Sequence, residues 1–173
     1  CLRRLHQALV DNADDFKALT TAEVGAPAFL TSGPQYDVPV EGIKWVTDLA
    51  ADYAWEAALP DASPMGIPTR RVVRREPVGV VAAITPWNFP NQINLAKVGP
   101  ALAAGCTVVL KAAPDTPWVA CELGRLAADI FPPGVFNVVT PASNEVASVL
   151  ATDPRVDLVS FTGSTATGRA VMA

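Results

Sequence analysis

Four apolar runs alternate with helical stretches over the C-terminal half of this chain, and this alternation constrains the fold more than any other feature. The apolar runs cover residues 78–84, 107–110, 135–139 and 158–161. Helical patterns lie between and after them, at residues 92–104, 118–130, 144–151 and from 163 onward. Nearly continuous apolar runs are typical of strands buried on both faces, and a regular exchange of strand and helix is typical of βαβ units. We therefore predict an α/β fold with a doubly wound parallel sheet.

The first 58 residues have the periodicity of helices. One apolar stripe at helical spacing is formed by Leu2, Leu5, Leu9 and Val10. A second helix is predicted to bury Phe16, Leu19 and Ala22 on its inner face. A third helix is predicted over residues 39–59. Nothing in these segments suggests chemistry, so we interpret them as scaffold.

Residues 59–77 interrupt the helical pattern. Prolines and a glycine at positions 60, 64, 66 and 68 break the third helix, and residues 69–75 combine strand-forming side chains with four arginines. Two interpretations stay open. The segment is either an exposed strand that its charge protects from aggregation, or a contact between subunits. The chain thus divides into N-terminal helices (1–58), this arm (59–77) and a sheet domain (78–173).

Charge and cysteine usage exclude several functions. Seventeen acidic residues against thirteen Lys and Arg give a net charge of −4, the opposite of the balance expected for a nucleic-acid-binding protein. No apolar run approaches the roughly 20 residues that span a bilayer, so no membrane partner is expected. Cys1, Cys106 and Cys121 lack metal-site spacing. We expect no metal and reduced thiols in a cytoplasmic protein.

The topology alone predicts where a ligand binds. In open parallel sheets, ligands bind beyond the carboxyl ends of the strands. Four segments follow the predicted strands, at residues 85–90, 111–115, 140–144 and 162–168. Each combines polar groups with Gly or Pro, so we predict that all four converge on one edge of the sheet.

Three positions in these segments are candidates for chemistry. Gly163 and Ser164 form a strand-to-helix turn that is either an anion site or a tight bend with a helix cap, because the spacing fits no phosphate-binding motif. Lys111 ends an apolar strand and is either solvated or a ligand of ribose hydroxyls or a phosphate. Asn88 lies between two prolines, and its amide either stabilises an oxyanion or satisfies loop backbone groups.

Several segments, in this order, resemble the aldehyde dehydrogenase superfamily. They are EPVGV at 76–80, ITPWNFP at 84–90, GPALAAGC at 99–106, VVLK at 108–111, FPPGV at 131–135 and FTGST at 161–165. The resemblance is strong from Arg75 to Arg169 and only generic in the opening helices. It implies a Rossmann-like cofactor domain with N-terminal helices and a protruding β-hairpin arm used for oligomerisation, which is an incomplete form of that family's fold.

The resemblance also implies a role for each matching residue. Asn88 would be the catalytic oxyanion donor, holding the substrate carbonyl oxygen as a thiohemiacetal forms. Lys111 would reach the adenosine ribose, Gly163 and Ser164 would meet the pyrophosphate, and Thr167 would lie near the adenine. The remaining expected cofactor-binding residues are Ile84, Thr85, Pro86, Trp87, Ala113, Pro114, Asp115 and Phe161.

Pro114 departs from the pattern of the family. The family often has Lys-Pro-x-Glu here, and its Glu accepts from both ribose hydroxyls and favours NAD. This chain has Lys-Ala-Ala-Pro from Lys111 to Pro114, with Asp115 one position later. The missing carboxylate removes repulsion against a 2′-phosphate. The expected cofactor is therefore NAD or NADP, with NAD slightly favoured.

The nucleophilic Cys and general-base Glu of the family lie downstream of the turn at Gly163, so we expect the catalytic domain to be missing from this chain. None of the three cysteines is a candidate nucleophile, and His6 is expected on the surface.

We interpret the chain as a fragment of an NAD(P)-dependent aldehyde dehydrogenase, inactive alone. The full-length enzyme would be a homo-oligomer, a dimer or tetramer, that oxidises an aldehyde to a carboxylic acid through a Cys thiohemiacetal and hydride transfer. Two alternatives stay open: a non-catalytic nucleotide-binding module, and an acyl-CoA or acyl-phosphate reductase of the same fold.

Overall fold

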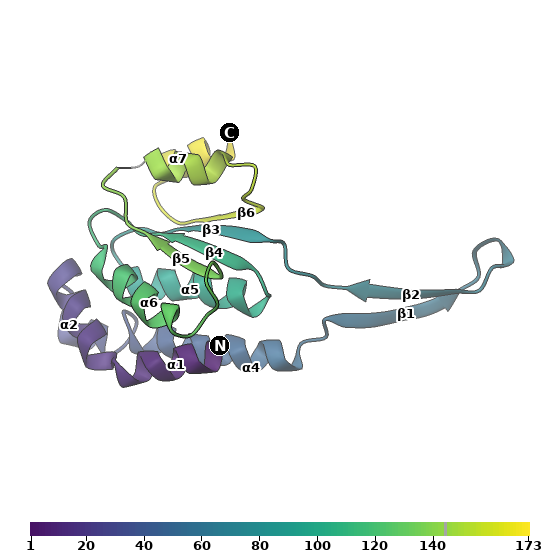
Figure 1. Ribbon diagram of the computed structural model, residues 1–173, viewed down its shortest axis with the longest axis horizontal. Helices are drawn as coiled ribbons and strands as arrows, with labels where there is room; N and C mark the ends of the chain where they lie inside the picture. The colour runs from purple at the N-terminus through teal and green to yellow at the C-terminus, as the bar shows by residue number, and fades with distance from the viewer. Residues whose placement is uncertain (144) are drawn as a thin grey trace.

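The computed structural model describes residues 1–143 and 145–173 and contains two separate sheets with their flanking helices (Figure 1). The helices are α1 (Leu2–Asp11), α2 (Ala13–Val24), α3 (Ala28–Thr31), α4 (Asp37–Asp52), η1 (Pro64–Gly66), α5 (Pro90–Ala103), α6 (Trp118–Ala128), α7 (Glu145–Thr152) and α8 (Thr165–Met172). The strands are β1 (Glu56–Ala62), β2 (Thr69–Arg74), β3 (Val80–Ile84), β4 (Thr107–Lys111), β5 (Phe136–Val139) and β6 (Leu158–Phe161). Asn144, the predicted start of the helix over 144–151, lies outside the described residues.

The larger sheet is parallel and has the strand order β5-β4-β3-β6. Val81 of β3 pairs with Val108 of β4 on one side and with Leu158 of β6 on the other. The chain moves outward from β3 through β4 to β5 and then crosses back to place β6 beside β3. The winding direction therefore reverses between β3 and β6, which makes this position the topological switch point. The predicted doubly wound parallel sheet is confirmed.

Helices cover both faces of the parallel sheet. α5 and α6 lie on one face, α7 and α8 lie on the other, and α1, α2 and α4 form an outer layer against α5 and α6 (Figure 1). Burial on both faces explains the apolar sequence of the strands, because Ala82, Ala83, Val108 and Leu110 are fully excluded from water. The main core lies on the side of α5 and α6 and includes Leu5, Leu9, Phe16, Ile43, Leu95, Val98 and Leu123.

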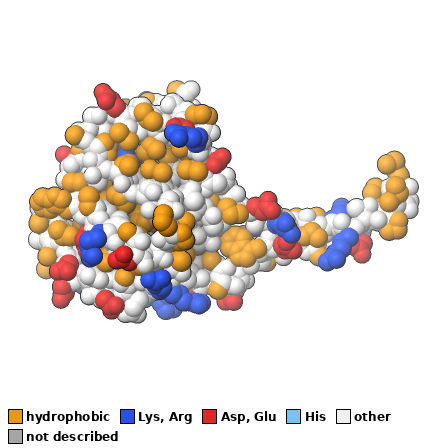
Figure 2. Space-filling model, viewed as in Figure 1, with side chains coloured by type: hydrophobic (Ala, Val, Ile, Leu, Met, Phe, Trp, Pro, Cys, Tyr) orange, Lys and Arg blue, Asp and Glu red, His pale blue; other side chains and the backbone are white. Residues whose placement is uncertain are grey.

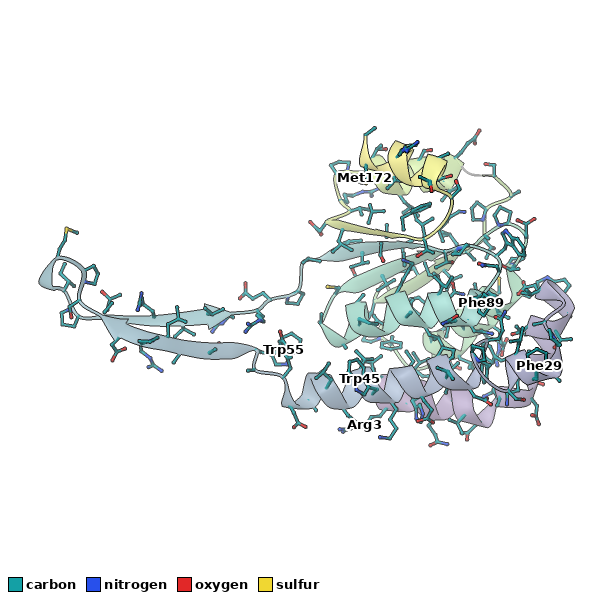
Figure 3. All side chains as sticks on the ribbon, turned by 180° about the vertical axis from the view of Figure 1, so that it is seen from behind. Arg3, Phe29, Trp45, Trp55, Phe89 and Met172 are labelled. Carbon is teal, nitrogen blue, oxygen red and sulfur yellow. The ribbon has the colours of Figure 1, made fainter. Side chains whose placement is uncertain are left out.

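β1 and β2 pair antiparallel into a two-stranded arm that projects away from the body (Figures 1 and 2). The predicted helix over 39–59 is too long, since α4 ends at Asp52 and β1 begins at Glu56 rather than at residue 59. Ala57 and Ala58 have a helical preference, but they pair across the arm with β2, and this pairing decides their conformation. Trp55 lies at the base of the arm, between α4 and β1 (Figure 3).

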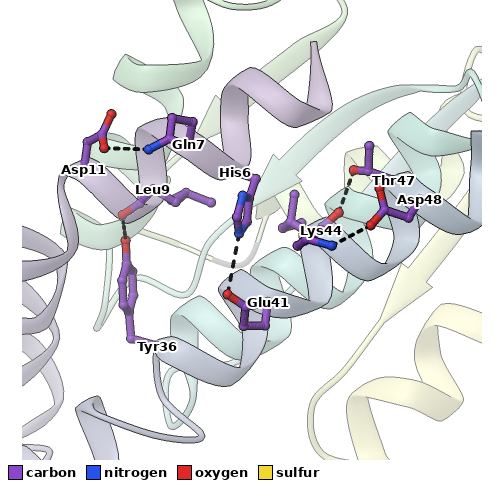
Figure 4. A network of polar contacts seen from close by, with 10 residues as sticks. His6, Gln7, Leu9, Asp11, Tyr36, Glu41, Lys44, Thr47 and Asp48 are labelled. Atoms are coloured by element: carbon purple, nitrogen blue, oxygen red, sulfur yellow. Dashed lines mark hydrogen bonds and ion pairs between the residues drawn. The ribbon is translucent and has the colours of Figure 1, made fainter.

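Tyr36 fastens the loop before α4 to the outer helical layer. Its hydroxyl donates a hydrogen bond to the carbonyl oxygen of Leu9 at 2.6 Å (Figure 4). Its ring stacks on Phe16 with the ring centroids 5.4 Å apart. Burial of the side chain raises the pKa of Tyr36 well above its usual range, so the hydroxyl stays protonated and able to donate.

Three expectations about the N-terminal helices are wrong. Val10 is 44% exposed and does not belong to the buried stripe of α1, which is formed by Leu5 and Leu9. The side chain of His6 is only 19% exposed, because α1 packs against α4 and brings Nε2 to 3.7 Å from the Glu41 carboxylate (Figure 4). On α2, Thr20 is buried and Ala22 is exposed. A buried threonine is tolerated there because its hydroxyl donates to the Phe16 carbonyl and accepts from the Asn91 amide.

Two features require a glycine at position 79, just before β3: the backbone conformation and the closeness of Asp157. Its φ is +120°, and a Cβ built on it would collide with the Asp157 carboxylate, which accepts from the Val80 amide at 2.8 Å. We expect Gly79→Ala to destabilise the protein by about 2–3 kcal/mol, through backbone strain and the loss of a charge-assisted hydrogen bond. Gly42→Ala is the control: this position lies in α4 with open space around it, and the change should stabilise by about 0.5–1 kcal/mol. Equal shifts in urea unfolding would contradict this account.

Candidate cofactor site

A cleft of about 1000 Å³ lies at the carboxyl ends of β3, β4 and β6. Ligand pockets commonly have volumes of about 300–1,000 Å³, so an extended ligand fits here. All of the predicted site residues line this cleft: Ile84, Thr85, Pro86, Trp87, Asn88, Lys111, Ala113, Pro114, Asp115, Phe161, Gly163, Ser164 and Thr167. The sheet topology brings them together from three separate loops.

Asn88 lies on the loop between β3 and α5 and is exposed to the cleft. Its main-chain carbonyl accepts a hydrogen bond from the Gln35 side chain at 2.9 Å. Its side-chain amide has no hydrogen-bond partner among the described residues, so it does not serve to satisfy the loop backbone. The amide is therefore free to donate to a ligand in the cleft.

Lys111 is the last residue of β4 and is only 3% exposed. The interpretation as a solvated side chain is therefore wrong. Burial lowers the pKa of Lys111, and no carboxylate of the described residues forms an ion pair with its ammonium group. A buried cation that lines a cleft and lacks a protein partner is suited to donate hydrogen bonds to hydroxyls or phosphate oxygens of a ligand.

Pro114 and Asp115 follow Lys111 along the rim of the cleft, and both are exposed. Asp115 lies close enough to line the cleft but forms no ion pair with Lys111. Pro114 contributes no polar side-chain atom at all. Among the described residues that line the cleft, Lys111 therefore has one carboxylate nearby, that of Asp115. Position 114, which is a proline, supplies none.

The turn after β6 is a tight bend with a helix cap. The Ser164 hydroxyl accepts a hydrogen bond from the Thr167 amide at 3.1 Å, which is the contact of an N-cap residue. A Cβ at Gly163 would lie 2.5 Å from the far end of the Phe161 ring, so a larger residue there would displace that ring. The cap leaves other amides of the first turn of α8 without intrahelical partners, and they border the cleft. The turn keeps the polarity of an anion site.

Sequence reasoning missed the part of the cleft that α7 forms, and of α8 it included only the residues up to 168. Small residues at helical spacing line it, namely Ala147 and Ala151 on α7 and Ala166 and Ala170 on α8. This repeated spacing of alanines was the available signal, because small side chains leave room between two helices. Ser148 and Thr152 add hydroxyl groups to the same wall.

The described residues of one predicted segment do not line the cleft. Residues 140–143 follow β5, which is the edge strand beyond β4, and none of them lines the cleft. All four strands are parallel, so this segment lies at the predicted edge of the sheet, but its described residues do not contribute to the cleft. Ligands bind at the switch point between β3 and β6, and the end of β5 lies two strands away from β3 along the sheet.

The cysteines lie away from the cleft. Cys106 is buried before β4, while Cys1 and Cys121 are exposed, and none of the three lines the cleft. In the part of the chain that the structure describes, no group of three His, Cys, Asp or Glu side chains is arranged to hold a metal ion. None of the helices described has the length and apolarity of a transmembrane span.

A doubly wound parallel sheet with a ligand-sized cleft at its switch point defines the class of Rossmann-type α/β domains. The whole chain, residues 1–173, matches the model of the aldehyde dehydrogenase family. The chain belongs to the aldehyde dehydrogenase family.

Named relatives and solved structures agree with this assignment. The chain is 41% identical over 175 residues to the mitochondrial succinate-semialdehyde dehydrogenase of Mus musculus, with 99% of this chain and 32% of the relative covered. It is 41% identical over 174 residues to the glutarate-semialdehyde dehydrogenase of Pseudomonas aeruginosa, with coverage of 99% and 35%.

The structure is also similar to crystal structures of this family. An NADP dependent enzyme of E. coli superposes with a TM-score of 0.91 at 40% identity, covering 99% of this chain and 35% of that one. An aldehyde dehydrogenase of Mycobacterium tuberculosis in complex with NAD+ superposes with a TM-score of 0.90 at 33% identity, covering 99% and 34%. The chain thus spans about a third of the length of the relatives it matches.

Proposed function

We propose that this chain is the cofactor-binding part of an NAD(P)-dependent aldehyde dehydrogenase. The observation that supports this best is the cleft at the switch point, where a buried, unpaired Lys111 and a free Asn88 amide line one space. The rest of the protein's activity is part of the proposal, because the chain spans about a third of its relatives.

The residues of the cleft fit a dinucleotide. The Lys111 ammonium has no protein partner among the described residues and would donate to the adenosine ribose. The first turn of α8, capped by Ser164, would face the pyrophosphate, since a helix N-terminus favours anions. The alanine-lined slot between α7 and α8, with Thr167 at its edge, has the apolar walls that a flat adenine ring requires.

Position 114 bears on the choice between NAD and NADP. A carboxylate there would accept from both ribose hydroxyls and would repel a 2′-phosphate, but Pro114 offers neither effect. Asp115 is the one acidic side chain at this rim. We propose that the protein uses NAD and tolerates NADP. The named neighbours include one NADP dependent enzyme and one complex with NAD+, in agreement with this range.

The bound cofactor would supply the hydride acceptor, and Asn88 would supply an oxyanion donor. When a thiolate attacks an aldehyde, negative charge develops on the carbonyl oxygen, and a fixed amide N–H stabilises it. The proposal assigns the thiol and the general base to segments outside residues 1–173, because no cysteine of this chain lines the cleft.

An activity assay tests the proposed function. The full-length protein should oxidise succinate semialdehyde or glutarate semialdehyde with NAD+ or NADP+ and release the carboxylic acid. Formation of the reduced nicotinamide is the readout. Reduction of an acyl-CoA or acyl phosphate in place of aldehyde oxidation would contradict the proposal, and so would the absence of any nicotinamide-dependent turnover.

We propose that the arm of β1 and β2 contacts a second copy of the protein. An isolated two-stranded hairpin is marginally stable in water, so a partner surface would stabilise it. Its exposed apolar side chains, Leu59, Met65, Ile67, Val72 and Val73, are the groups such a surface would cover. Two of its arginines contact the arm itself: Arg74 forms an ion pair with Glu56, and Arg71 donates to the Pro60 carbonyl.

Removal of the arm should change the oligomeric state. Replacing residues 57–73 of the full-length protein by a short glycine linker should convert an oligomer into smaller species in light scattering, with the cleft still able to bind cofactor. Trp45→Ser is the control, because Trp45 is 67% exposed on α4, away from the arm (Figure 3). An unchanged molar mass after removal of the arm would contradict the proposed contact.

A further inference from the structure

Gln35 connects the N-terminal helices to the loop of the candidate site. It is only 2% exposed, although it lies in the loop before α4 and carries a polar amide. Its Nε2 donates to the main-chain carbonyl of Asn88 at 2.9 Å across 53 positions of sequence. This hydrogen bond therefore holds the peptide group between Asn88 and Phe89, next to the Cα that carries the Asn88 side chain.

Gln35 is itself held rigidly. Its backbone amide donates to the Leu30 carbonyl at 2.9 Å. The next residue, Tyr36, is fastened by its hydrogen bond to Leu9 (Figure 4) and by its stacking on Phe16. The donor that meets Asn88 is therefore held in place by contacts with the outer helical layer.

The Asn88 loop depends on such an external anchor. Pro86 cannot donate a backbone hydrogen bond, and neither can Pro90, the first residue of α5. Regular secondary structure begins only at α5, so the Asn88 carbonyl takes its hydrogen bond from outside the loop. Phe89 lies beside this junction between the sheet layer and the N-terminal helices (Figure 3).

The amide of Gln35 is only half satisfied. Its Oε1 is buried and has no hydrogen-bond partner among the described residues. A buried polar atom without a partner costs free energy, which an apolar side chain of similar shape would avoid. Glutamine is therefore not the most stabilising residue at position 35. What it provides, and an apolar side chain could not, is the hydrogen bond to the Asn88 carbonyl.

We propose that Gln35 is a positioning residue, which fixes the backbone at Asn88 so that the Asn88 amide is preorganised to donate to the substrate oxyanion. This inference rests on the proposed function of the cleft. Preorganised donors are effective because they need no reorientation as charge develops. Loss of the anchor would leave the Asn88 amide present but less often in the productive orientation.

Two single variants of the full-length protein and a double-mutant cycle with Asn88→Ala test this. Gln35→Leu keeps the approximate volume and removes the donor. Gln35→Leu should lower kcat for succinate semialdehyde oxidation roughly 10-fold, because the Asn88 amide is then less often in the productive orientation. The KM for NAD+ should be unchanged. Thr20→Val is the matched control, because it breaks a different hydrogen bond from the N-terminal layer, the buried one from Asn91 of α5 to Thr20 of α2 at 2.7 Å. Thr20→Val should leave kcat within about 2-fold of wild type if only preorganisation of Asn88 matters.

The double variant separates positioning from general damage. In a protein that already carries Asn88→Ala, Gln35→Leu should cause no further loss of kcat, because the group it positions is gone. Multiplicative losses, or an equal loss of kcat in Thr20→Val, would overturn the inference while leaving the proposed function intact.

Amide hydrogen exchange gives a test of the anchoring role that does not depend on enzyme activity. The Ile93 amide, which donates to the Phe89 carbonyl at 3.0 Å, should exchange faster in Gln35→Leu than in Thr20→Val. Equal rates in the two variants would overturn the anchoring role. A wild-type protein that lacks aldehyde oxidation would overturn the proposed function and the catalytic part of this inference, and the exchange rates would still decide whether Gln35 fixes the loop.

Discussion

Replacing Asn88 by alanine in the full-length protein is expected to lower kcat for aldehyde oxidation roughly 100-fold or more, the usual effect of removing an oxyanion donor. The side-chain amide lines the cleft and has no partner in the described chain, so its removal leaves no buried group unsatisfied. Stability should therefore change little, and the loss should appear in the acylation step. Single-turnover measurement of hydride transfer gives the rate.

Gln92→Ala is the matched control for the Asn88 change. Gln92 also carries a side-chain amide and lies four positions further along the chain, in the first turn of α5, but it does not line the cleft. Its replacement should leave kcat within about 2-fold of wild type, as for a site away from the chemistry. A loss in Asn88→Ala that is confined to the KM for the cofactor would contradict the oxyanion role.

Lys111→Met is expected to weaken NAD+ binding roughly 10- to 100-fold, because a hydrogen bond to a charged group contributes about 1.5–3 kcal/mol. The ammonium is buried against the cleft and has no other partner among the described residues. Lys97→Met is the control for cofactor affinity. Lys97 is also partly buried with a lowered pKa, but it donates to Ser160 at 2.9 Å and does not line the cleft.

The burial of Lys111 also predicts how NAD+ binding depends on pH. Burial lowers the pKa of Lys111 below the ordinary value of 10.5, so the ammonium loses its proton earlier than a solvated lysine does. Affinity for NAD+ should therefore be constant at neutral pH and decline on the alkaline side, below pH 10.5. Lys111→Arg should remove this decline, since arginine stays charged. A wild-type affinity that is independent of pH up to 10.5 would contradict the role of the ammonium.

The sheet and most of the cleft could be predicted from the sequence because both depend on local patterns. The run at 158–161 is β6 without any shift, since a strand buried on both faces is apolar at every position. The rule that ligands bind after the strands then identifies Asn88, Lys111 and Ser164 without reference to side-chain contacts.

The features that the sequence did not reveal depend on contacts between distant residues. The end of α4 is set by the pairing of Ala57 and Ala58 with β2, which overrides local preference. The wall of α7 and α8 is lined by alanines that carry no chemical signal of their own. Gln35 acts on Asn88 from another layer of the fold, and no short motif contains both residues.

A crystal structure of the full-length protein with NAD+ tests the central claim most directly. The dinucleotide should occupy the cleft at the ends of β3, β4 and β6, with its adenine between α7 and α8 and its adenosine ribose hydroxyls within hydrogen-bond distance of the Lys111 ammonium. Its nicotinamide should lie on the side of Asn88. A dinucleotide bound elsewhere, or bound in this cleft without contact to Lys111, would contradict the proposed site.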